Sequence, residues 1–324
     1  MKIEAVYDMV AEDLQAVEKE LERNIQSEVS LISTLGKYIL NSGGKRFRPL
    51  ILILSARLCG YKGRDHISLA SILEFIHTAT LLHDDVVDNA KVRRGNVSAN
   101  TIWGNQASIL IGDFFFARSF SLISQTKNWR LIKVLTEATT KLAKGEILDL
   151  VKERDISCNE NDYLSIVTHK TASLFEAASQ IGAILGGVNE EKEKVMKDFG
   201  YNLGIAFQCM DDTLDYISTQ EEFGKDIGKD LKEGKVTLPL IHTIQNSSSK
   251  DQKIIFSAIE KEEVAEKNLN LIMELIKKYQ GIEYSIKKAR SYAQAAKQAL
   301  NGFAQTLEKQ ALITVADYVV ERRN

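Results

Sequence analysis

Only two prolines interrupt the 324-residue chain, Pro49 and Pro239. Proline ends or kinks helices because it lacks the backbone N–H and clashes with the preceding turn, so its scarcity leaves few enforced helix ends. Ala, Leu, Lys, Glu and Ile dominate long stretches, and no run shows the sustained period-two alternation of a half-buried strand. The sequence therefore predicts an all-α helical bundle that is large enough to bury a substantial core.

Glycine and proline residues mark several of the predicted helix ends and starts. Residues 41–44 (NSGG) are expected to end one helix, because glycine adopts the left-handed conformation that C-caps favour. Pro49 and Pro239 both fit the first turn of a helix, the latter with Thr237 as the N-cap. The glycine-containing stretch 219–235 is expected to be a loop, and residues 251–324 to be helix after helix. The other predicted helices are 8–26, 31–40, 68–88, 105–125, 130–152, 162–185 and 190–216.

Composition limits the domain count and the classes of partner. Length alone allows two domains, but no Gly/Ser-rich or Pro-rich linker and no repeat divides the chain. We therefore expect a single helical domain over residues 1–324. The 42 basic and 44 acidic residues nearly balance, so no global field is expected to recruit nucleic acid.

The cysteines and apolar segments bear on location. Three widely spaced cysteines fit neither a disulfide framework nor a zinc site, which favours a reducing cytosol. Residues 1–5 lack the apolar core of a signal peptide. The most apolar run, 50–54, is flanked by Arg48 and Arg57 and is too short to span a bilayer. A soluble, cytoplasmic protein is expected.

Two acidic clusters with the same spacing carry the strongest chemical signal: 84–88 (DDVVD) and 211–215 (DDTLD). On a helix, the first and last aspartates of each cluster share one face. Like charges at that spacing destabilise a helix unless a cation lies between them. Carboxylate oxygens of this kind suit Mg²⁺, which often shares its coordination shell with phosphates. The clusters predict two metal-binding walls for a phosphorylated substrate, although a single acidic triple is usually a solvated face.

Basic segments accompany these clusters. Residues 43–49 (GGKRFRP) combine glycines, exposed N–H groups and three cations at a helix start, the composition of an anion site. Arg93 and Arg94 follow the first acidic cluster, and His77 precedes it by two helical turns. Each of these features also has an ordinary structural explanation. Residues 43–49 could be a solvated basic turn, Arg93 and Arg94 could form a surface salt-bridge network, and His77 could be a structural histidine.

The combination of segments resembles the trans-type isoprenyl diphosphate synthases, and within them the long-chain, octaprenyl-like polyprenyl enzymes. The resemblance spans roughly residues 43–240 in the family's order. It is carried by the two acidic clusters, by residues 43–49, and by further short segments, which are 93–95 (RRG), 112–114 (GDF), 145–146 (GE), 169–171 (HKT), 207–210 (FQCM), 224–226 (GKD) and 233–240 (EGKVTLPL).

The resemblance implies an all-helical, dimeric enzyme with a deep central cavity. It would elongate an allylic diphosphate, such as farnesyl diphosphate, by successive trans head-to-tail condensations with isopentenyl diphosphate. Three Mg²⁺ ions per active site would be coordinated by Asp84, Asp88 and Asp211. The product would serve a quinone side chain and could pass to a membrane, which would make the protein peripheral to it.

Roles for the remaining site residues also follow from the resemblance. Isopentenyl diphosphate would be held by Lys45, Arg48, His77 and Arg94. The allylic diphosphate would be held by Arg93, Lys170, Lys225 and Lys235. Thr171 and Gln208, with Lys170, would form the catalytic group, turning oxygen dipoles toward the developing carbocation. Asp85, Asp212 and Asp215 would support the metals.

Product length is expected to depend on the small residues Ala79 and Thr80, which precede the first acidic cluster. In this family the corresponding positions guard the tunnel into which the product grows. Four phenylalanines are candidates for the tunnel floor or, equally, ordinary core aromatics; they are Phe114, Phe115, Phe116 and Phe120.

Alternatives remain at this point. A terpene cyclase also ionises prenyl diphosphates, but typically pairs one aspartate-rich motif with a different second motif and lacks the GGKR segment. A non-catalytic subunit of a heteromeric synthase usually loses one acidic motif. A shorter product, geranylgeranyl or farnesyl diphosphate, is the alternative closest to the main hypothesis.

Overall fold

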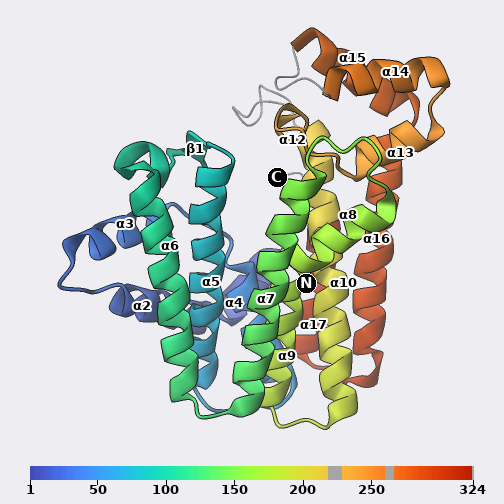
Figure 1. Ribbon diagram of the computed structural model, residues 1–324. Helices are drawn as coiled ribbons and strands as arrows, with labels where there is room; N and C mark the ends of the chain where they lie inside the picture. The colour runs from blue at the N-terminus through green and yellow to red at the C-terminus, as the bar shows by residue number, and fades with distance from the viewer. Residues whose placement is uncertain (218–227, 260–265, 323–324) are drawn as a thin grey trace. The chain divides into compact units, whose positions relative to one another are not determined.

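The computed structural model describes residues 1–217, 228–259 and 266–322, and the prediction of an all-α protein is confirmed. Apart from helices, the described residues contain one two-stranded antiparallel hairpin, β1 Val92–Arg93 and β2 Asn96–Val97 (Figure 1). The α-helices are α1 Ile3–Met9, α2 Ala11–Asn24, α3 Ser30–Asn41, α4 Phe47–Leu58, α5 Asp65–Val87, α6 Ala99–Gln125, α7 Trp129–Lys152, α8 Glu160–Val167, α9 Ser173–Leu185, α10 Glu190–Ile217, α12 Lys229–Lys232, α13 Leu238–Asn246, α14 Ser249–Ile259, α15 Glu266–Lys278, α16 Gly281–Ala299 and α17 Leu307–Glu321.

The chain forms two compact units. The first comprises Met1–Glu137, Ala177–Lys197 and Phe303–Leu312, and the second comprises Ala138–Glu176, Asp198–Gly302 and Ile313–Asn324. Four helices, α7, α9, α10 and α17, have residues in both units. The expectation of a single domain over residues 1–324 stays a prediction.

The first unit is built on α5. Helix α5 is buried along most of its length, and its neighbours α2, α4 and α6 pack on it. Leu50 to Leu54 of α4 are fully buried, which explains why the most apolar run of the sequence is a core helix. Helices α5 and α6 run side by side (Figure 1), and the β1–β2 hairpin joins them.

The second unit has its own hydrophobic core. Buried residues of α8, α10, α13 and the helices that follow form one cluster, which includes Ile205, Leu238, Leu240 and Ile272. Helix α13 packs closely on α16 because Gly281 lies directly against the carbonyl oxygen of Pro239.

Several predicted boundaries were wrong for identifiable reasons. The predicted helix 8–26 is two helices, α1 and α2, because Val10 leaves helical geometry (φ −121°, ψ 16°). The predicted helix 162–185 is divided by a π-helical turn, Thr168–Ala172. Thr237 does precede α13, but its side chain makes no capping hydrogen bond; its hydroxyl pairs instead with that of Tyr216 at 2.9 Å.

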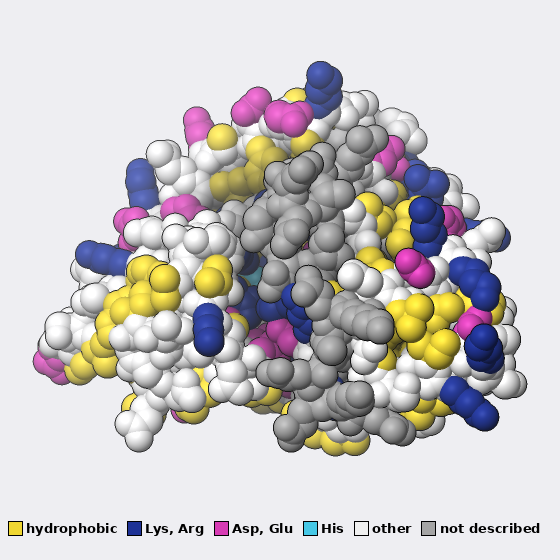
Figure 2. Space-filling view, turned by 90° about the horizontal axis from the view of Figure 1, so that it is seen from above, with side chains coloured by type: hydrophobic (Ala, Val, Ile, Leu, Met, Phe, Trp, Pro, Cys, Tyr) yellow, Lys and Arg dark blue, Asp and Glu magenta, His cyan; other side chains and the backbone are white. Residues whose placement is uncertain are grey.

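Helix α6 is, among the described residues, the one helix long and apolar enough to cross a membrane by length and composition alone. A core helix of a soluble protein meets the same criteria, and α6 packs along α5. Acidic and basic side chains both occur over the visible face of the molecule (Figure 2), in keeping with the nearly balanced charge.

The close contact at Gly281 gives a test of the fold. A Cβ at this position would meet the Pro239 carbonyl oxygen and lie 2.7 Å from Thr243 Oγ1. Gly281→Ala should therefore lower the free energy of unfolding by about 1–3 kcal/mol, the usual cost of overpacking. Gly302→Ala is the control, because a Cβ there meets nothing within 4 Å. Equal denaturation midpoints for the two variants would contradict this packing.

Candidate active site

The β1–β2 hairpin presents two of the predicted site arginines. Its central residues, Arg94 and Gly95, both have positive φ (51° and 79°), as a type I′ turn requires. The Arg94 guanidinium donates a hydrogen bond to the carbonyl oxygen of Gly43. A Cβ on Gly44 would lie 2.7 Å from Arg94 Nη1. The glycine pair before α4 therefore makes room for Arg94, and the two basic segments form one cluster.

Arg46 has a structural part in this cluster. Its guanidinium donates to Glu18 at 2.6 Å, to Glu74 at 2.9 Å and to the carbonyl oxygen of Leu40 at 2.9 Å. Glu74 is buried, so the pair is largely shielded from water. Of the three cations at the start of α4, this one is neutralised by protein carboxylates.

His77 lies among the arginines. Burial lowers its pKa well below the usual range, and the guanidinium groups of Arg48, Arg94, Arg93 and Arg46 lower it further. His77 is therefore neutral, with one N–H to donate. The structure thus brings together four residues that the sequence analysis proposed for diphosphate binding: Arg48, His77, Arg93 and Arg94.

The first acidic cluster ends α5. Asp84 and Asp88 are half-buried and one helical turn apart, with the Asp88 N–H donating to the Asp84 carbonyl oxygen at 2.8 Å. Asp85 is fully buried and accepts a 2.6 Å hydrogen bond from Arg93 Nε. Asp85 therefore fixes Arg93, while Asp84 and Asp88 share the other face of the helix end.

In the second unit, two helices pack closely on the π-helical turn that carries Lys170 and Thr171. A Cβ on Gly145 of α7 would meet the backbone of His169 and Lys170, and one on Gly204 of α10 would lie 2.6 Å from Ala172 Cα. Only glycine permits both approaches. Local π-helical turns often occur at functional sites, and here the turn is held from two sides.

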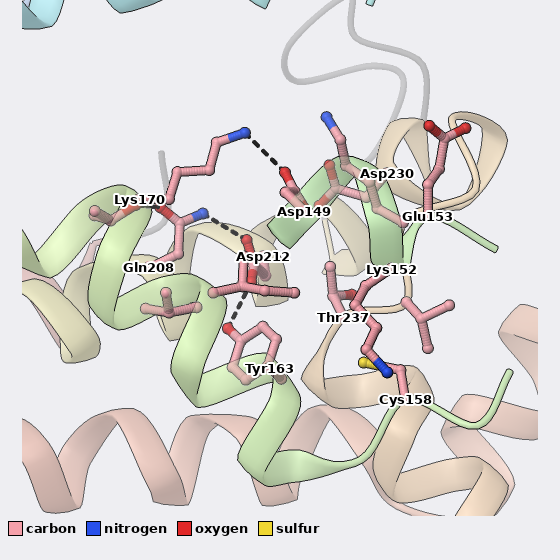
Figure 3. Close-up of a pocket in the computed structure, with 15 residues that line it drawn as sticks. Asp149, Lys152, Glu153, Cys158, Tyr163, Lys170, Gln208, Asp212, Asp230 and Thr237 are labelled. Atoms are coloured by element: carbon pink, nitrogen blue, oxygen red, sulfur yellow. Dashed lines mark hydrogen bonds and ion pairs between the residues drawn. The ribbon is translucent and has the colours of Figure 1, made fainter. Parts of the chain in front are cut away.

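The turn faces a cavity of about 110 Å³ within the second unit (Figure 3). Five predicted site residues line it, namely Lys170, Thr171, Gln208, Asp212 and Lys235. Lys170 Nζ forms ion pairs with Glu146 and Asp149, both at 2.7 Å, and Lys235 Nζ pairs with Glu233 at 2.8 Å. Both cations are thus positioned by carboxylates at the cavity.

Buried carboxylates also line this cavity. Burial raises the pKa of Asp212 to about 7 and raises the pKa of Asp230 well above its usual range, with Asp212 and Asp215 adding to the effect. Hydrogen bonds to Asp212 from Tyr163 Oη at 2.5 Å and from Gln208 Nε2 at 2.7 Å oppose the rise. Asp149, Tyr163 and Asp230 were not predicted; the i, i+3 spacing of Glu146 and Asp149 was the available signal for one of them.

The other aspartates of the second cluster have distinct partners. Asp211 is half exposed and accepts from Arg322 Nη2 at 3.1 Å, and the same guanidinium lies over the Phe207 ring. Asp215 accepts from the backbone N–H groups of Lys229 and Asp230 and so caps α12. Lys225 lies outside the described residues.

Metal binding has to be considered unit by unit. Asp84 and Asp88 belong to the first unit and Asp211 to the second. Within residues 1–217, 228–259 and 266–322, no three His, Cys, Asp or Glu side chains are grouped to hold a metal ion.

The chain-length candidates lie on α5 and α6. Ala79 and Thr80 are buried, and the Thr80 hydroxyl donates to the His77 carbonyl oxygen at 2.8 Å. Of the four phenylalanines, Phe115 is fully buried against Phe75 (5.2 Å between centroids) and is a core residue. Phe120 is 38% exposed, and Phe116 stacks on His83.

Comparison with known proteins agrees with this geometry. The family model described as polyprenyl synthetase matches residues 29–276. The chain belongs to the polyprenyl synthetase family. It is a prenyltransferase, a polyprenyl diphosphate synthase, and the activity predicted from the sequence is confirmed at that level.

Relatives of this polyprenyl diphosphate synthase match it over its full length. It is 40% identical to the octaprenyl diphosphate synthase of Escherichia coli (strain K12) over 322 residues, 99% of each chain. It is 37% identical to an all-trans-nonaprenyl-diphosphate synthase of Rhodobacter capsulatus, over 97% of this chain and 96% of that one. The crystal structure of a Caulobacter crescentus polyprenyl synthase, complexed with calcium and isoprenyl diphosphate, superimposes with a TM-score of 0.95 at 39% identity and covers 100% of this chain and 98% of that one.

The contact at Gly145 predicts how the π-helical turn affects turnover. Gly145→Ala would displace the Lys170 backbone, and a displacement of about 1 Å can cost ~10²-fold in rate. We expect kcat for prenyl transfer to fall by about 10²-fold. The adjacent exposed residue supplies the control, Lys144→Ala. If both variants turn over like the wild type, the close packing of α7 on the turn has no catalytic consequence.

Proposed function

We propose that the enzyme makes a long-chain, octaprenyl-like all-trans polyprenyl diphosphate by repeated condensation of isopentenyl diphosphate onto an allylic primer such as farnesyl diphosphate. The observation that carries the proposal is the retention of two separate basic sites, the arginine cluster around His77 and the lysine-lined cavity, each beside an acidic motif. Two diphosphates need two such sites. The full-length similarity to an octaprenyl diphosphate synthase supports the product class.

The arginine cluster suits isopentenyl diphosphate. Arg48, Arg94 and neutral His77 can all donate to phosphate oxygens, and guanidinium groups bind them in bidentate fashion. Lys45, at the start of α4, adds a fourth donor. The cavity of the second unit suits the allylic diphosphate, with Lys170 and Lys235 as donors, and Lys225 and Arg93 complete the predicted set.

Divalent cations fit the carboxylates. Asp211 already pairs with a cationic guanidinium. Burial raises the pKa values of Asp212 and Asp230, neighbouring carboxylates add to the effect, and a nearby cation would favour the ionised forms. We assign Mg²⁺, three ions per site, to Asp84, Asp88 and Asp211. When bound, Mg²⁺ would stabilise the negative charge of the leaving diphosphate.

Side chains of the protein would stabilise the departing diphosphate and the allylic cation. Lysine and arginine side chains would stabilise the departing diphosphate. Thr171 and Gln208 would direct oxygen lone pairs at the allylic cation, which the C=C bond of isopentenyl diphosphate attacks. Loss of a proton to the released pyrophosphate completes the step, so no protein nucleophile is needed. The product suits transfer to a membrane-bound acceptor such as a quinone precursor, from a cytoplasmic enzyme.

Product analysis tests the proposal. Purified protein is incubated with Mg²⁺, farnesyl diphosphate and labelled isopentenyl diphosphate, and the dephosphorylated products are sized by chromatography. We expect octaprenyl-class products. A geranylgeranyl product would support the short-chain alternative, a cyclic hydrocarbon the cyclase, and absence of turnover a non-catalytic subunit.

Ala79 should control product length, since a larger side chain five residues before Asp84 would close the growth path. Ala79→Tyr is expected to shift the products to shorter chains, measured in the same assay. Ala79→Ser keeps a small side chain and serves as the control. An unchanged product distribution in a stably folded Ala79→Tyr variant would rule out this gate.

A homodimer is supported by the apolar surface of α6. Ile102, Ile109, Leu110 and Phe120 are between 38% and 65% exposed on this one helix, and exposed apolar patches mark interaction sites. Leu110→Lys should convert a dimer to a monomer in light scattering coupled to size exclusion. Leu307→Lys, at an exposed leucine of α17, should not. A monomeric wild-type protein would contradict the dimer.

Arg322 should compete with metal for Asp211. An ion pair of this kind contributes about 0.2–1 kcal/mol, so Arg322→Gln is expected to lower the Mg²⁺ concentration for half-maximal activity by up to about fivefold. Arg290→Gln is the control at an exposed arginine. A higher Mg²⁺ requirement in Arg322→Gln would show that Arg322 assists metal binding instead.

A further inference from the structure

Tyr163 is a buried tyrosine of α8 that lines the cavity and donates to Asp212 (Figure 3). We propose that Tyr163 is a positioning residue, which acts through Asp212 and Gln208 to hold the Thr171 hydroxyl with its lone pairs toward the cavity. This inference rests on the role given to Thr171 in the proposed function. Tyr163 itself is not assigned a contact with the substrate.

The direction of the hydrogen bonds supports this role. Asp212 accepts one hydrogen bond at each carboxylate oxygen, from Tyr163 Oη to Oδ2 at 2.5 Å and from Gln208 Nε2 to Oδ1 at 2.7 Å. In an amide side chain only the nitrogen can donate. The NH₂ group of the Gln208 amide must therefore face Asp212. Its carbonyl oxygen, Oε1, then faces Thr171.

Thr171 has one hydroxyl proton, and the network fixes where it goes. Thr171 Oγ1 donates to Gln208 Oε1 at 2.7 Å. Because that bond uses the only proton, the hydroxyl can present only lone pairs to the cavity, which Thr171 lines. Lone pairs stabilise a cation, whereas a proton aimed at the same point would destabilise it.

Tyr163 strengthens this arrangement because it supplies the second donor to a carboxylate that has been removed from water. Tyr163 Oη holds Asp212 Oδ2, which leaves Oδ1 aimed at Gln208 Nε2. Without the phenol, the Asp212 carboxylate could rotate away from this position, and the Gln208 amide and the Thr171 hydroxyl that donates to it would lose their fixed orientation. The phenol therefore favours the orientation that suits a carbocation.

A double-mutant cycle tests the proposal. Tyr163→Phe removes one oxygen atom and should lower kcat about tenfold, the usual scale for losing a hydrogen bond to a charged group, with KM for both diphosphates unchanged. In a Thr171→Val background the same change should have no further effect, because the hydroxyl is gone. In Thr171→Ser, which keeps a hydroxyl, the tenfold loss should return.

The control is Tyr284→Phe, which removes a phenol–carboxylate hydrogen bond of the same length, from Tyr284 Oη to Glu160 (2.5 Å). This variant should retain the wild-type kcat. A primer with fluorine beside the allylic cation provides a readout that a structural defect would not change: the ratio of unfluorinated to fluorinated rates should rise in Tyr163→Phe and not in Tyr284→Phe.

The outcomes distinguish the positioning role of Tyr163 from the carbocation-stabilising role of Thr171. Equal losses from Tyr163→Phe in the wild-type and Thr171→Val backgrounds overturn the positioning role but leave Thr171 in place. An unchanged kcat in Thr171→Val overturns the role of Thr171 itself. If Tyr163→Phe does not fold, Tyr163→Met takes its place in the cycle, because it also removes the phenol oxygen and its flexible side chain can fill the buried space; the same loss and the same dependence on the Thr171 hydroxyl are expected.

Discussion

Repulsion among carboxylates is the interaction on which the rest of this structure depends. Asp84 and Asp88 share the end of α5, and burial with neighbouring carboxylates raises the pKa values of Asp212 and Asp230. Such arrangements cost free energy unless cations offset them. The protein supplies some of these cations itself: Arg93 on Asp85, Arg322 on Asp211, and Lys170 on Glu146 and Asp149.

Glycines determine how closely the cationic groups approach. Gly44 leaves space for Arg94, and Gly145 and Gly204 let α7 and α10 press on the π-helical turn that carries Lys170 and Thr171. A diphosphate site needs fixed donors, because flexible lysines would lose conformational entropy on binding. The close contacts therefore fix the backbone from which the side chains of Lys170 and Thr171 extend.

The sequence predicted the helical fold and most helix positions, because two prolines interrupt few helices and the spacing of apolar residues is typical of amphipathic helices and not of strands. It also identified residues that the structure brings together, including Arg48 with His77 and Lys170 with Gln208. The π-helical turn and the hairpin were missed, since a one-residue insertion and two-residue strands leave no periodic signal. Tyr163 was missed because its position beside Asp212 is a long-range contact, 49 residues apart. Roles of single residues remain predictions.

The central claim of the proposed function is that both acidic clusters are needed to bind divalent cations together with a diphosphate. The most direct measurement is the shift in melting temperature on adding Mg²⁺ with inorganic pyrophosphate, since a ligand that binds only the folded state raises Tm. We expect a shift in the wild-type protein that needs both additions and is lost in Asp84→Asn and in Asp211→Asn alike. A full shift in either variant, or one from pyrophosphate without Mg²⁺, would contradict the account.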